Sequence, residues 1–221
     1  MADVGAPVTV DQHGRVLLVT MDDGRANAMS ITVSTALRAA LAQAEADPGV
    51  GAVVIAGRAG GFDLGVIQGS DADSIREMVD SGGALVAHAY GASVPVVAAC
   101  TGHAVAAGAL LLLGCDHRLG ADADVKIGLN EVAIGLTLPD WALAIATERL
   151  SRRHLQASVV NARLYDGAGA VSAGFLDTVV EPDAVVDAAM AHAAAWAELD
   201  PAAYAATVRA LRGPTLTRMA G

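Results

Sequence analysis

Short, continuous apolar segments separated by helix-like segments are the feature that most constrains the fold of this chain. Three of them, residues 16–21, 53–56 and 94–99, contain almost no polar side chain. A strand that faces water on one side alternates apolar and polar residues, whereas a continuously apolar strand is buried on both faces. We therefore expect an α/β layer in which helices cover both faces of the strands.

The segments between these strands carry helix signals. Ser30 can cap a helix over residues 31–46, whose apolar positions recur every four residues. A second helix is expected over 71–90, with a break at the glycines of 81–83. Further helices are expected at 106–113, 141–150, 151–161, 184–199 and from 201 onward. Short strands are expected at 116–119 and 125–128, and a glycine-rich turn at 57–61.

The composition is that of a globular enzyme-sized domain. Of 221 residues, 54% are hydrophobic and 17% are charged, which is enough apolar surface for a large core. Only 3% are aromatic, so the core must be built from Ala, Val, Leu and Ile. The one plausible boundary lies near Glu181 and Pro182, and it divides a core of residues 1–182 from an alanine-rich helical segment of residues 183–221.

Charge and cysteine usage exclude several classes of partner. The net charge is −10, with Lys126 as the single lysine, so we expect no general attraction for nucleic acid or for anionic membranes. The longest apolar run, 104–113, is too short to span a bilayer, and the N-terminus does not resemble a signal peptide. Cys100 and Cys115 lie in apolar runs and are expected to be buried, reduced thiols, which favours a cytoplasmic location.

Five segments, in this order, resemble the crotonase (enoyl-CoA hydratase/isomerase) superfamily. Together they cover roughly residues 10–185. The first is 25–29 (RANAM), and the second is 54–57 with 62–66. The third is 95–99 with 102–108 and 115–118, the fourth is 127–131 (IGLNE) with Gly135 and Pro139, and the fifth is 170–177 with 179–180. The IGLNE run, with Trp141 just past the proline, is most similar to the Δ3,Δ2-enoyl-CoA isomerase branch.

The resemblance implies a fold, a substrate class and an assembly. The fold is the crotonase (ClpP-like) spiral of ββα units, with C-terminal helices that serve oligomerisation in a homotrimer or hexamer. The substrate is an acyl-CoA thioester of fatty acid metabolism, and neither a metal nor a redox cofactor is needed, since coenzyme A is part of the substrate.

The resemblance also implies an oxyanion hole made of two backbone N–H groups. One donor is the N–H of Val66, after Gly65, and the other is the N–H of Ala107 at the start of an apolar helix. Such donors are already oriented toward the developing negative charge of a thioester oxygen, and the helix N-terminus adds to that stabilisation. In this chain Leu64 precedes the glycine and Ile67 follows Val66, which makes the site narrower and more apolar than is usual in the family.

Glu131 is the candidate acid/base. Its sequence neighbours are apolar, and an apolar setting raises the pKa of a carboxyl group toward the range suited to proton transfer at neutral pH. By resemblance, Leu110 occupies the position where hydratases place a second glutamate. The expected function is therefore isomerisation of 3-enoyl-CoA by one glutamate that moves a proton between C2 and C4.

Several residues have two alternative roles. Asp140 either caps the helix over 141–150 or supplies a second catalytic carboxylate, which would suit an enoyl-CoA hydratase or a hydrolase-like reaction. Arg25, with Ala26, either contacts a CoA phosphate or is solvated, and His103 is either a hydrogen-bonded structural histidine or a catalytic one. A catalytically silent protein that binds CoA thioesters is the alternative outside enzymes.

Overall fold

A computed structural model describes residues 6–24, 27–58, 60–64 and 71–221. The strands are β1 (Val8–His13), β2 (Val16–Met21), β3 (Ala52–Gly57), β4 (Gly60–Leu64), β5 (Val96–Cys100), β6 (Gly102–Val105), β7 (His117–Ala121), β8 (Ile127–Gly128) and β9 (Thr178–Val180). The helices are α1 (Ile31–Ala46), α2 (Ala72–Gly91), α3 (Ala107–Gly114), α4 (Asp140–Arg149), α5 (Leu155–Val159), α6 (Gly167–Ala173), α7 (Val185–Trp196) and α8 (Pro201–Ala220). Short 3₁₀ helices occupy η1 (Val132–Ile134) and η2 (Pro182–Ala184).

The strands form two sheets that the chain visits in turn. The larger sheet has the order β1-β2-β3-β5-β7-β9 and the smaller one β4-β6-β8. Apart from the antiparallel pair β1–β2, all neighbours are parallel. The order β3-β4-α2 and then β5-β6-α3 is a repeated ββα unit whose first strand joins the larger sheet and whose second joins the smaller. The expected α/β class and ββα spiral are confirmed.

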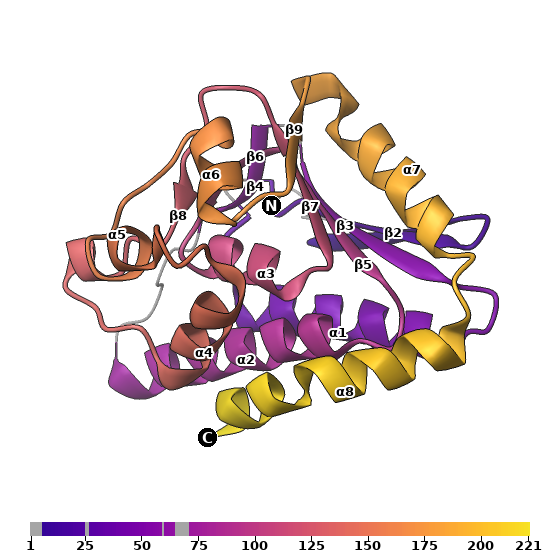
Figure 1. Cartoon of the computed structure of the whole chain (residues 1–221), viewed down its shortest axis with the longest axis horizontal. Coiled ribbons are helices and arrows are strands. Elements are labelled where there is room, and N and C mark those ends of the chain that lie inside the picture. The colour runs from indigo at the N-terminus through magenta and orange to yellow at the C-terminus, as the bar shows by residue number, and fades with distance from the viewer. Residues whose placement is uncertain (1–5, 25–26, 59, 65–70) are drawn as a thin grey trace, which may run out of the picture.

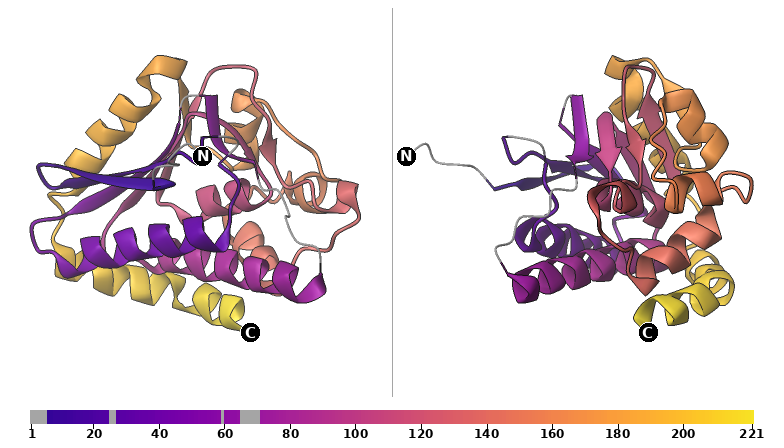
Figure 2. Two further views of the ribbon diagram at one scale, coloured as in Figure 1. Left: turned by 180° about the vertical axis from the view of Figure 1, so that it is seen from behind. Right: turned by 90° about the vertical axis from the view of Figure 1, so that its left-hand side faces the viewer.

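The larger sheet is buried on both faces, as its continuous apolar strands predict. Side chains that alternate along β3 point to opposite sides: Val53 and Ile55 join a core with α1, α2 and α3, while Val54 joins a second core with α7. Figure 1 shows α7 on one side of this sheet and the other helices on its opposite side, and the reverse view in Figure 2 shows the same layers. The expected strand over 16–21 and the helix from Ser30 to residue 46 are confirmed.

The predicted break in the helix over 71–90 is wrong, because α2 runs without interruption from Ala72 to Gly91. Gly82 and Gly83 are both buried within α2, so neither forms a turn. A Cβ atom at Gly83 would lie 2.8 Å from the indole of Trp141 on α4, whereas a Cβ at Gly82 would meet no atom of the described residues within 4 Å. Gly83 therefore lets the indole ring lie directly against the α2 backbone.

Four strands, β1, β4, β6 and β9, were not predicted, and one predicted helix is shorter than expected. The turn expected at 57–61 is present, because β3 ends at Gly57, β4 begins at Gly60, and the N–H of Gly61 donates to the carbonyl of Arg58 at 3.1 Å. β4 itself begins with two glycines, which carry little strand signal. β1, with five of its six residues exposed, gives no apolar run. The helix expected over 151–161 is only the short α5, whereas the helix expected over 184–199 is confirmed as α7, which follows the last residue of η2.

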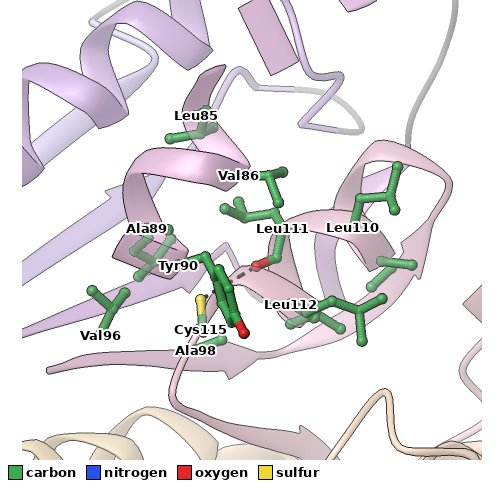
Figure 3. Packing of buried hydrophobic residues seen from close by; sticks show 14 of the residues in the cluster. Leu85, Val86, Ala89, Tyr90, Val96, Ala98, Leu110, Leu111, Leu112 and Cys115 are labelled. Carbon is green, nitrogen blue, oxygen red and sulfur yellow. Dashed lines mark hydrogen bonds between the residues drawn. The ribbon is translucent and has the colours of Figure 1, made fainter. Parts of the chain in front are cut away.

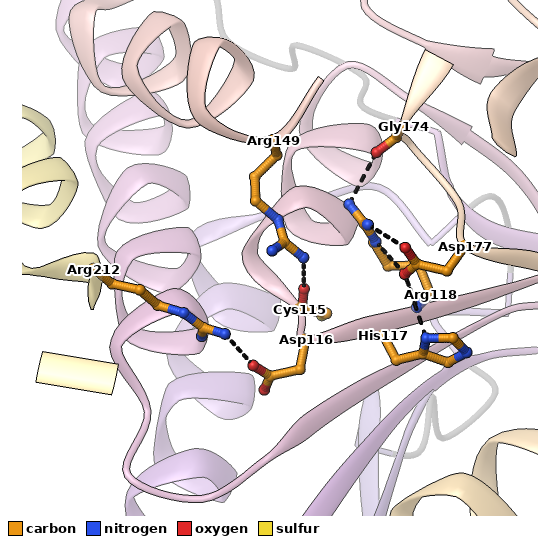
Figure 4. Close-up of polar contacts among 8 residues, drawn as sticks. All are labelled: Cys115, Asp116, His117, Arg118, Arg149, Gly174, Asp177 and Arg212. Atoms are coloured by element: carbon orange, nitrogen blue, oxygen red, sulfur yellow. Dashed lines mark hydrogen bonds and ion pairs between the residues drawn. The ribbon is translucent and has the colours of Figure 1, made fainter. Parts of the chain in front are cut away.

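The C-terminal helices pack on their own chain. Val185, Ala189 and Ala193 of α7 lie fully buried in the second core against the sheet. Arg212 of α8 forms an ion pair with Asp116 (Figure 4). Arg212 also donates a hydrogen bond to the carbonyl of Tyr90 at 2.8 Å. One face of α7 is therefore covered by the same chain, whereas Asp187, Ala191 and Ala195 on the rest of the helix are exposed, and the expected oligomer stays a prediction. The boundary between residues 182 and 183 stays a prediction.

A second ion pair secures the edge of the larger sheet. Arg118 of β7 is nearly buried and donates to both carboxylate oxygens of Asp177, at 2.8 Å to Oδ2 and 2.6 Å to Oδ1 (Figure 4). Burial by itself raises the pKa of Asp177, but the hydrogen bonds and charge of Arg118 outweigh it and hold the pKa below its ordinary value. This pair fixes the loop before β9. Because Arg118 belongs to the 115–118 segment and Asp177 to the 170–177 segment, these two segments have a structural role here.

No helix in the described part of the chain is both long enough and apolar enough to cross a membrane.

The glycine pair of α2 gives a test of the packing against Trp141. We expect Gly83→Ala to lower the free energy of unfolding by roughly 1–2 kcal/mol, because overpacking outweighs the gain in helix propensity. Gly82→Ala, at the preceding residue, is the matched control and should leave the free energy of unfolding unchanged or raise it by up to about 1 kcal/mol. Urea denaturation of both variants measures the difference. Equal stability of the two variants would contradict the packing assigned to Trp141.

Candidate active site

A cavity of about 260 Å³ opens between α2, the first turn of α3 and the segment from η1 to α4. Its described lining is almost entirely apolar and consists of Met29, Ile75, Met78, Val79, Gly82, Ala106, Ala107, Leu110, Glu131, Ile134, Leu136, Thr137, Pro139 and Trp141. Glu131 is the one carboxylate among these described residues. The cavity therefore has the shape of an apolar ligand site with one titratable group.

Glu131 is held at the start of η1, three residues after β8 ends. Its carbonyl oxygen accepts hydrogen bonds from the N–H groups of Ile134, at 3.1 Å, and Leu136, at 2.9 Å. Its side-chain Oε2 is buried and has no hydrogen-bond partner among the described residues. The backbone of this segment is therefore fixed, while one carboxylate oxygen remains available to a ligand.

Burial raises the pKa of Glu131, and hydrogen bonds from nearby backbone groups counter this only in part. The direction is the one expected from the sequence. Among the apolar sequence neighbours, Val132 is 46% exposed, whereas Ile134 lines the cavity together with Glu131. The other apolar walls of the cavity complete the burial of the carboxyl group. A carboxyl group with a raised pKa is suited to take up and return a proton near neutral pH.

Ala107 is the first residue of α3 and lines the same cavity. The N–H groups in the first turn of a helix have no acceptor within the helix, and the helix dipole makes this end favourable for negative charge. The turn into α3 is sharp, because Ala106 adopts φ +54° and ψ −113°. A positive φ is uncommon for a residue with a Cβ atom, and such conformations occur frequently at ligand sites.

One backbone hydrogen bond connects the two halves of the site. The N–H of Ala106 donates to the carbonyl of Gly128 at 2.9 Å, at the end of the β6–β8 pairing. β6 leads directly into Ala107, and β8 leads within three residues to Glu131. The smaller sheet therefore places the helix N-terminus and the carboxylate on the same cavity.

Leu110 also lines the cavity and is 3% exposed. It lies one helical turn after Ala107, so the wall beside the candidate oxyanion donor is apolar. Asp140 does not line the cavity: it is exposed, and it is the first residue of α4. Pro139 occupies the N-cap position, so the interpretation of Asp140 as the cap is off by one residue. As a residue of the first turn, Asp140 still interacts favourably with the helix dipole.

Five of the expected site residues, Arg25, Ala26, Gly65, Val66 and Ile67, lie outside the described residues. β4 ends at Leu64, whose backbone pairs with Val105 of β6, two residues before Ala107. Asn27 holds the start of the segment leading to α1: its side-chain amide donates to the carbonyl of Met21 at 2.9 Å and to that of Gly61 at 3.3 Å. The buried Asn27 thereby fixes this segment beside β4.

Sequence reasoning missed the wall that α2 contributes. Ile75, Met78, Val79 and Gly82 all line the cavity. They recur at the spacing i, i+3, i+4 and i+7, which marks one face of a helix. That spacing is visible in the sequence, but it predicts only an apolar face and does not distinguish a cavity wall from a core contact.

His103 and the cysteines do not belong to this cavity. The ring Nδ1 of His103 accepts a hydrogen bond from the N–H of Lys126 at 2.9 Å, and the residue faces another depression, which supports the structural reading. Cys100 and Cys115 are buried free thiols, as expected. Burial raises the pKa of each to about 12, so neither forms a nucleophilic thiolate near neutral pH.

The site and the fold agree with comparisons to known proteins. A model of the enoyl-CoA hydratase/isomerase family matches residues 11–219. A protein of Rhizobium meliloti (strain 1021), named a probable enoyl-CoA hydratase, is 30% identical over 219 residues, which are 96% of this chain and 84% of the relative. Several mycobacterial relatives match over only 38% to 42% of their own length. The chain belongs to the enoyl-CoA hydratase/isomerase family, and it is an enzyme of the class that acts on acyl-CoA thioesters.

Solved structures support the same family. An enoyl-CoA isomerase of Mycobacterium tuberculosis is 37% identical, with 97% of this chain and 95% of that chain covered and a TM-score of 0.91. The same mycobacterial protein is also named a probable enoyl-CoA hydratase. Human mitochondrial Δ3-Δ2-enoyl-CoA isomerase covers 97% of this chain and 86% of its own, with a TM-score of 0.91, but at 24% identity it shows the fold alone. The names of relatives therefore do not decide between the two reactions.

The raised pKa of Glu131 makes the stability of the protein depend on pH. The folded state binds this proton more tightly than the unfolded state does, so the contribution is fully present below the ordinary pKa of 4.5 and is lost as the pH rises through the raised value. Glu131→Gln removes the titration. We therefore expect the stability of Glu131→Gln, relative to the unmodified protein, to increase from acid to neutral pH in denaturation curves.

Glu45 supplies a control with the opposite sign. Burial by itself raises its pKa, but hydrogen bonds from His88 and from the N–H of Ser93 outweigh this and lower it. Its contribution to stability is present above the ordinary pKa and is lost at lower pH. Glu45→Gln should therefore lose relative stability as the pH rises. The same pH dependence in both variants would contradict the buried environment of Glu131.

Proposed function

We propose that the protein is a Δ3,Δ2-enoyl-CoA isomerase that moves a double bond with a single glutamate. The observation that carries this proposal is the composition of the cavity. Glu131, with an unpartnered Oε2, is the one carboxylate in its described lining, and Leu110 faces the same space. A lone carboxylate in an apolar cavity suits a reaction that needs one proton acceptor and no positioned water.

The proposed reaction uses this carboxylate twice. Glu131 removes a proton from C2 of a 3-enoyl thioester, and the electrons move into the thioester carbonyl to give a dienolate. The N–H of Ala107, and by resemblance that of Val66, stabilises the negative charge on the oxygen. The protonated Glu131 then returns the proton at C4, and the double bond lies between C2 and C3. Atoms and charge balance without a metal or a redox cofactor, so we propose that the enzyme uses neither.

Hydration of 2-enoyl-CoA is the second candidate, and the names of several relatives favour it. It requires a water molecule held by polar groups beside the substrate. Leu110 supplies no such group, and a buried water without partners is unfavourable. Asp140 is exposed and outside the cavity lining, so it does not supply one either. A hydrolase-like reaction at Asp140 meets the same objection. The available Oε2 of Glu131 speaks against a catalytically silent binding protein.

Glu131→Gln tests the proton transfer. The variant keeps the size of the side chain and removes the base, so we expect kcat for isomerisation to fall by about a hundredfold to ten-thousandfold. Asp140→Asn is the matched control, since it removes a carboxylate from the adjacent helix and should change kcat little. The assay follows conversion of 3-hexenoyl-CoA to the 2-enoyl product. Near-normal turnover by Glu131→Gln would show that another group transfers the proton.

The two candidate reactions separate in a direct comparison on one preparation. We expect isomerisation of 3-hexenoyl-CoA to be faster than hydration of crotonyl-CoA by at least about tenfold, because the described lining of the cavity offers no second carboxylate to hold the water. Product analysis by chromatography gives both rates. Hydration that is as fast as isomerisation would contradict the isomerase proposal and would assign a catalytic role to Asp140.

The assembly and location remain predictions from the resemblance and the composition. We propose a homotrimer or hexamer, although α7 is buried against its own chain, and a cytoplasmic location, in keeping with the two free cysteines. Sedimentation equilibrium measures the assembly: a trimer or hexamer at micromolar concentration is expected, and a monomer would contradict it.

A further inference from the structure

We infer that Gly82 is the floor of the cavity and that its missing side chain determines how long an acyl chain the enzyme accepts. This inference rests on the proposed use of acyl-CoA thioesters and concerns a different residue from those that perform the chemistry. Gly82 is buried and lines the cavity, yet a Cβ atom built on it would meet no atom within 4 Å among the residues that the structure describes. A buried glycine with free space above it marks a place where a side chain would occupy the cavity.

The cavity follows α2 along one face. Ile75, Met78, Val79 and Gly82 line it in sequence. With a rise of about 1.5 Å per residue, the seven steps from Ile75 to Gly82 correspond to a wall of about 10 Å. Ala107 and Leu110 of α3 line the same space. The space is therefore elongated and apolar, in the way that an extended acyl chain requires.

One helical turn after Gly82 the space is closed. Val86 is 2% exposed and belongs to the core. A Cβ atom at Gly114, near the end of α3, would lie 3.0 Å from the carbonyl oxygen of Val86, so the two helices are in close contact there. Figure 3 shows Val86 on α2 beside Leu111 of α3. α2 and α3 therefore leave room at Gly82 and none at Val86, which makes Gly82 the end of the cavity.

The neighbouring glycine fixes the side wall at the same level. The indole of Trp141 lies against Gly83, where a Cβ atom would approach it to 2.8 Å, and the same indole lines the cavity. The wall is thus rigid at the depth of Gly82, so a longer chain cannot be accommodated by moving Trp141 toward α2. The depth of the cavity then depends on what occupies position 82.

A panel of acyl-CoA thioesters of increasing length tests this inference, with binding measured separately from turnover. Dissociation constants of saturated acyl-CoAs from butanoyl to dodecanoyl are measured by calorimetry for the unmodified protein, Gly82→Ala and Gly82→Val. We expect the ratio of long-chain to short-chain affinity to fall about tenfold or more in Gly82→Ala, the discrimination that one methylene-sized group gives in an apolar pocket. The loss should be larger in Gly82→Val.

Gly213→Ala is the matched control. Gly213 is another helical glycine whose built Cβ would meet no described atom within 4 Å, but it lies on α8 outside the described cavity lining. It should leave the chain-length profile unchanged. Thermal unfolding of Gly82→Ala at or above the temperature of the unmodified protein would show that the fold is intact.

The outcomes distinguish this inference from the proposed reaction. An unchanged chain-length profile in both Gly82 variants would overturn the role of Gly82, whichever reaction the enzyme catalyses. Failure of every saturated acyl-CoA to bind the unmodified protein would overturn it as well. The Gly82 variants could show the expected preference for shorter acyl chains in a protein that does not isomerise 3-enoyl thioesters. That result would support Gly82 as the floor of the cavity and reject only the isomerase proposal.

Discussion

The hydrogen bond from the N–H of Ala106 to the carbonyl of Gly128 is the contact on which the site depends. It closes the pairing of β6 with β8, two strands of only four and two residues. Gly128 has φ +148°, and a Cβ atom there would lie 2.9 Å from the carbonyl oxygen of Arg163, so the position requires glycine. Because this strand end is fixed, the first N–H groups of α3 and the carboxyl group of Glu131 open on one cavity.

The apolar lining of the cavity has two consequences that belong together. It disfavours the charged form of Glu131, which raises the pKa of this carboxyl group and leaves it able to accept and return a proton. It also provides the surface against which an acyl chain can be buried, with Leu110 on one side and α2 on the other. The same burial therefore supplies both the reactivity of the base and the affinity for the substrate.

The extent to which the sequence predicts this structure differs between elements. The strand over 16–21 and the helix after Ser30 could be predicted because their apolar spacing and the cap are local signals. The prediction of a break in α2 was wrong. The glycine at position 83 makes room for the indole of Trp141, almost sixty residues later, and the local sequence carries no information about that contact. Distant contacts of this kind override intrinsic propensity.

The residues of the candidate site also differ in how far the sequence predicts them. Glu131, Ala107 and Leu110 could be identified because a known motif surrounds each, and all three line the cavity. Asp140 was placed near the site by its neighbourhood in the sequence, but the first turn of α4 directs it to the surface. The α2 wall could not be assigned, since an apolar helical face looks the same whether it contacts the core or a ligand.

The account rests on one carboxylate that carries the proton from C2 to C4, and isotope transfer measures this directly. A 3-enoyl-CoA deuterated at C2 is converted in ordinary water, and the position of deuterium in the 2-enoyl product is read by NMR. Because Glu131 is enclosed by apolar walls, the account predicts that a measurable share of the deuterium removed from C2 appears at C4. Complete replacement by solvent hydrogen at C4 would contradict a single enclosed carboxylate as the proton carrier.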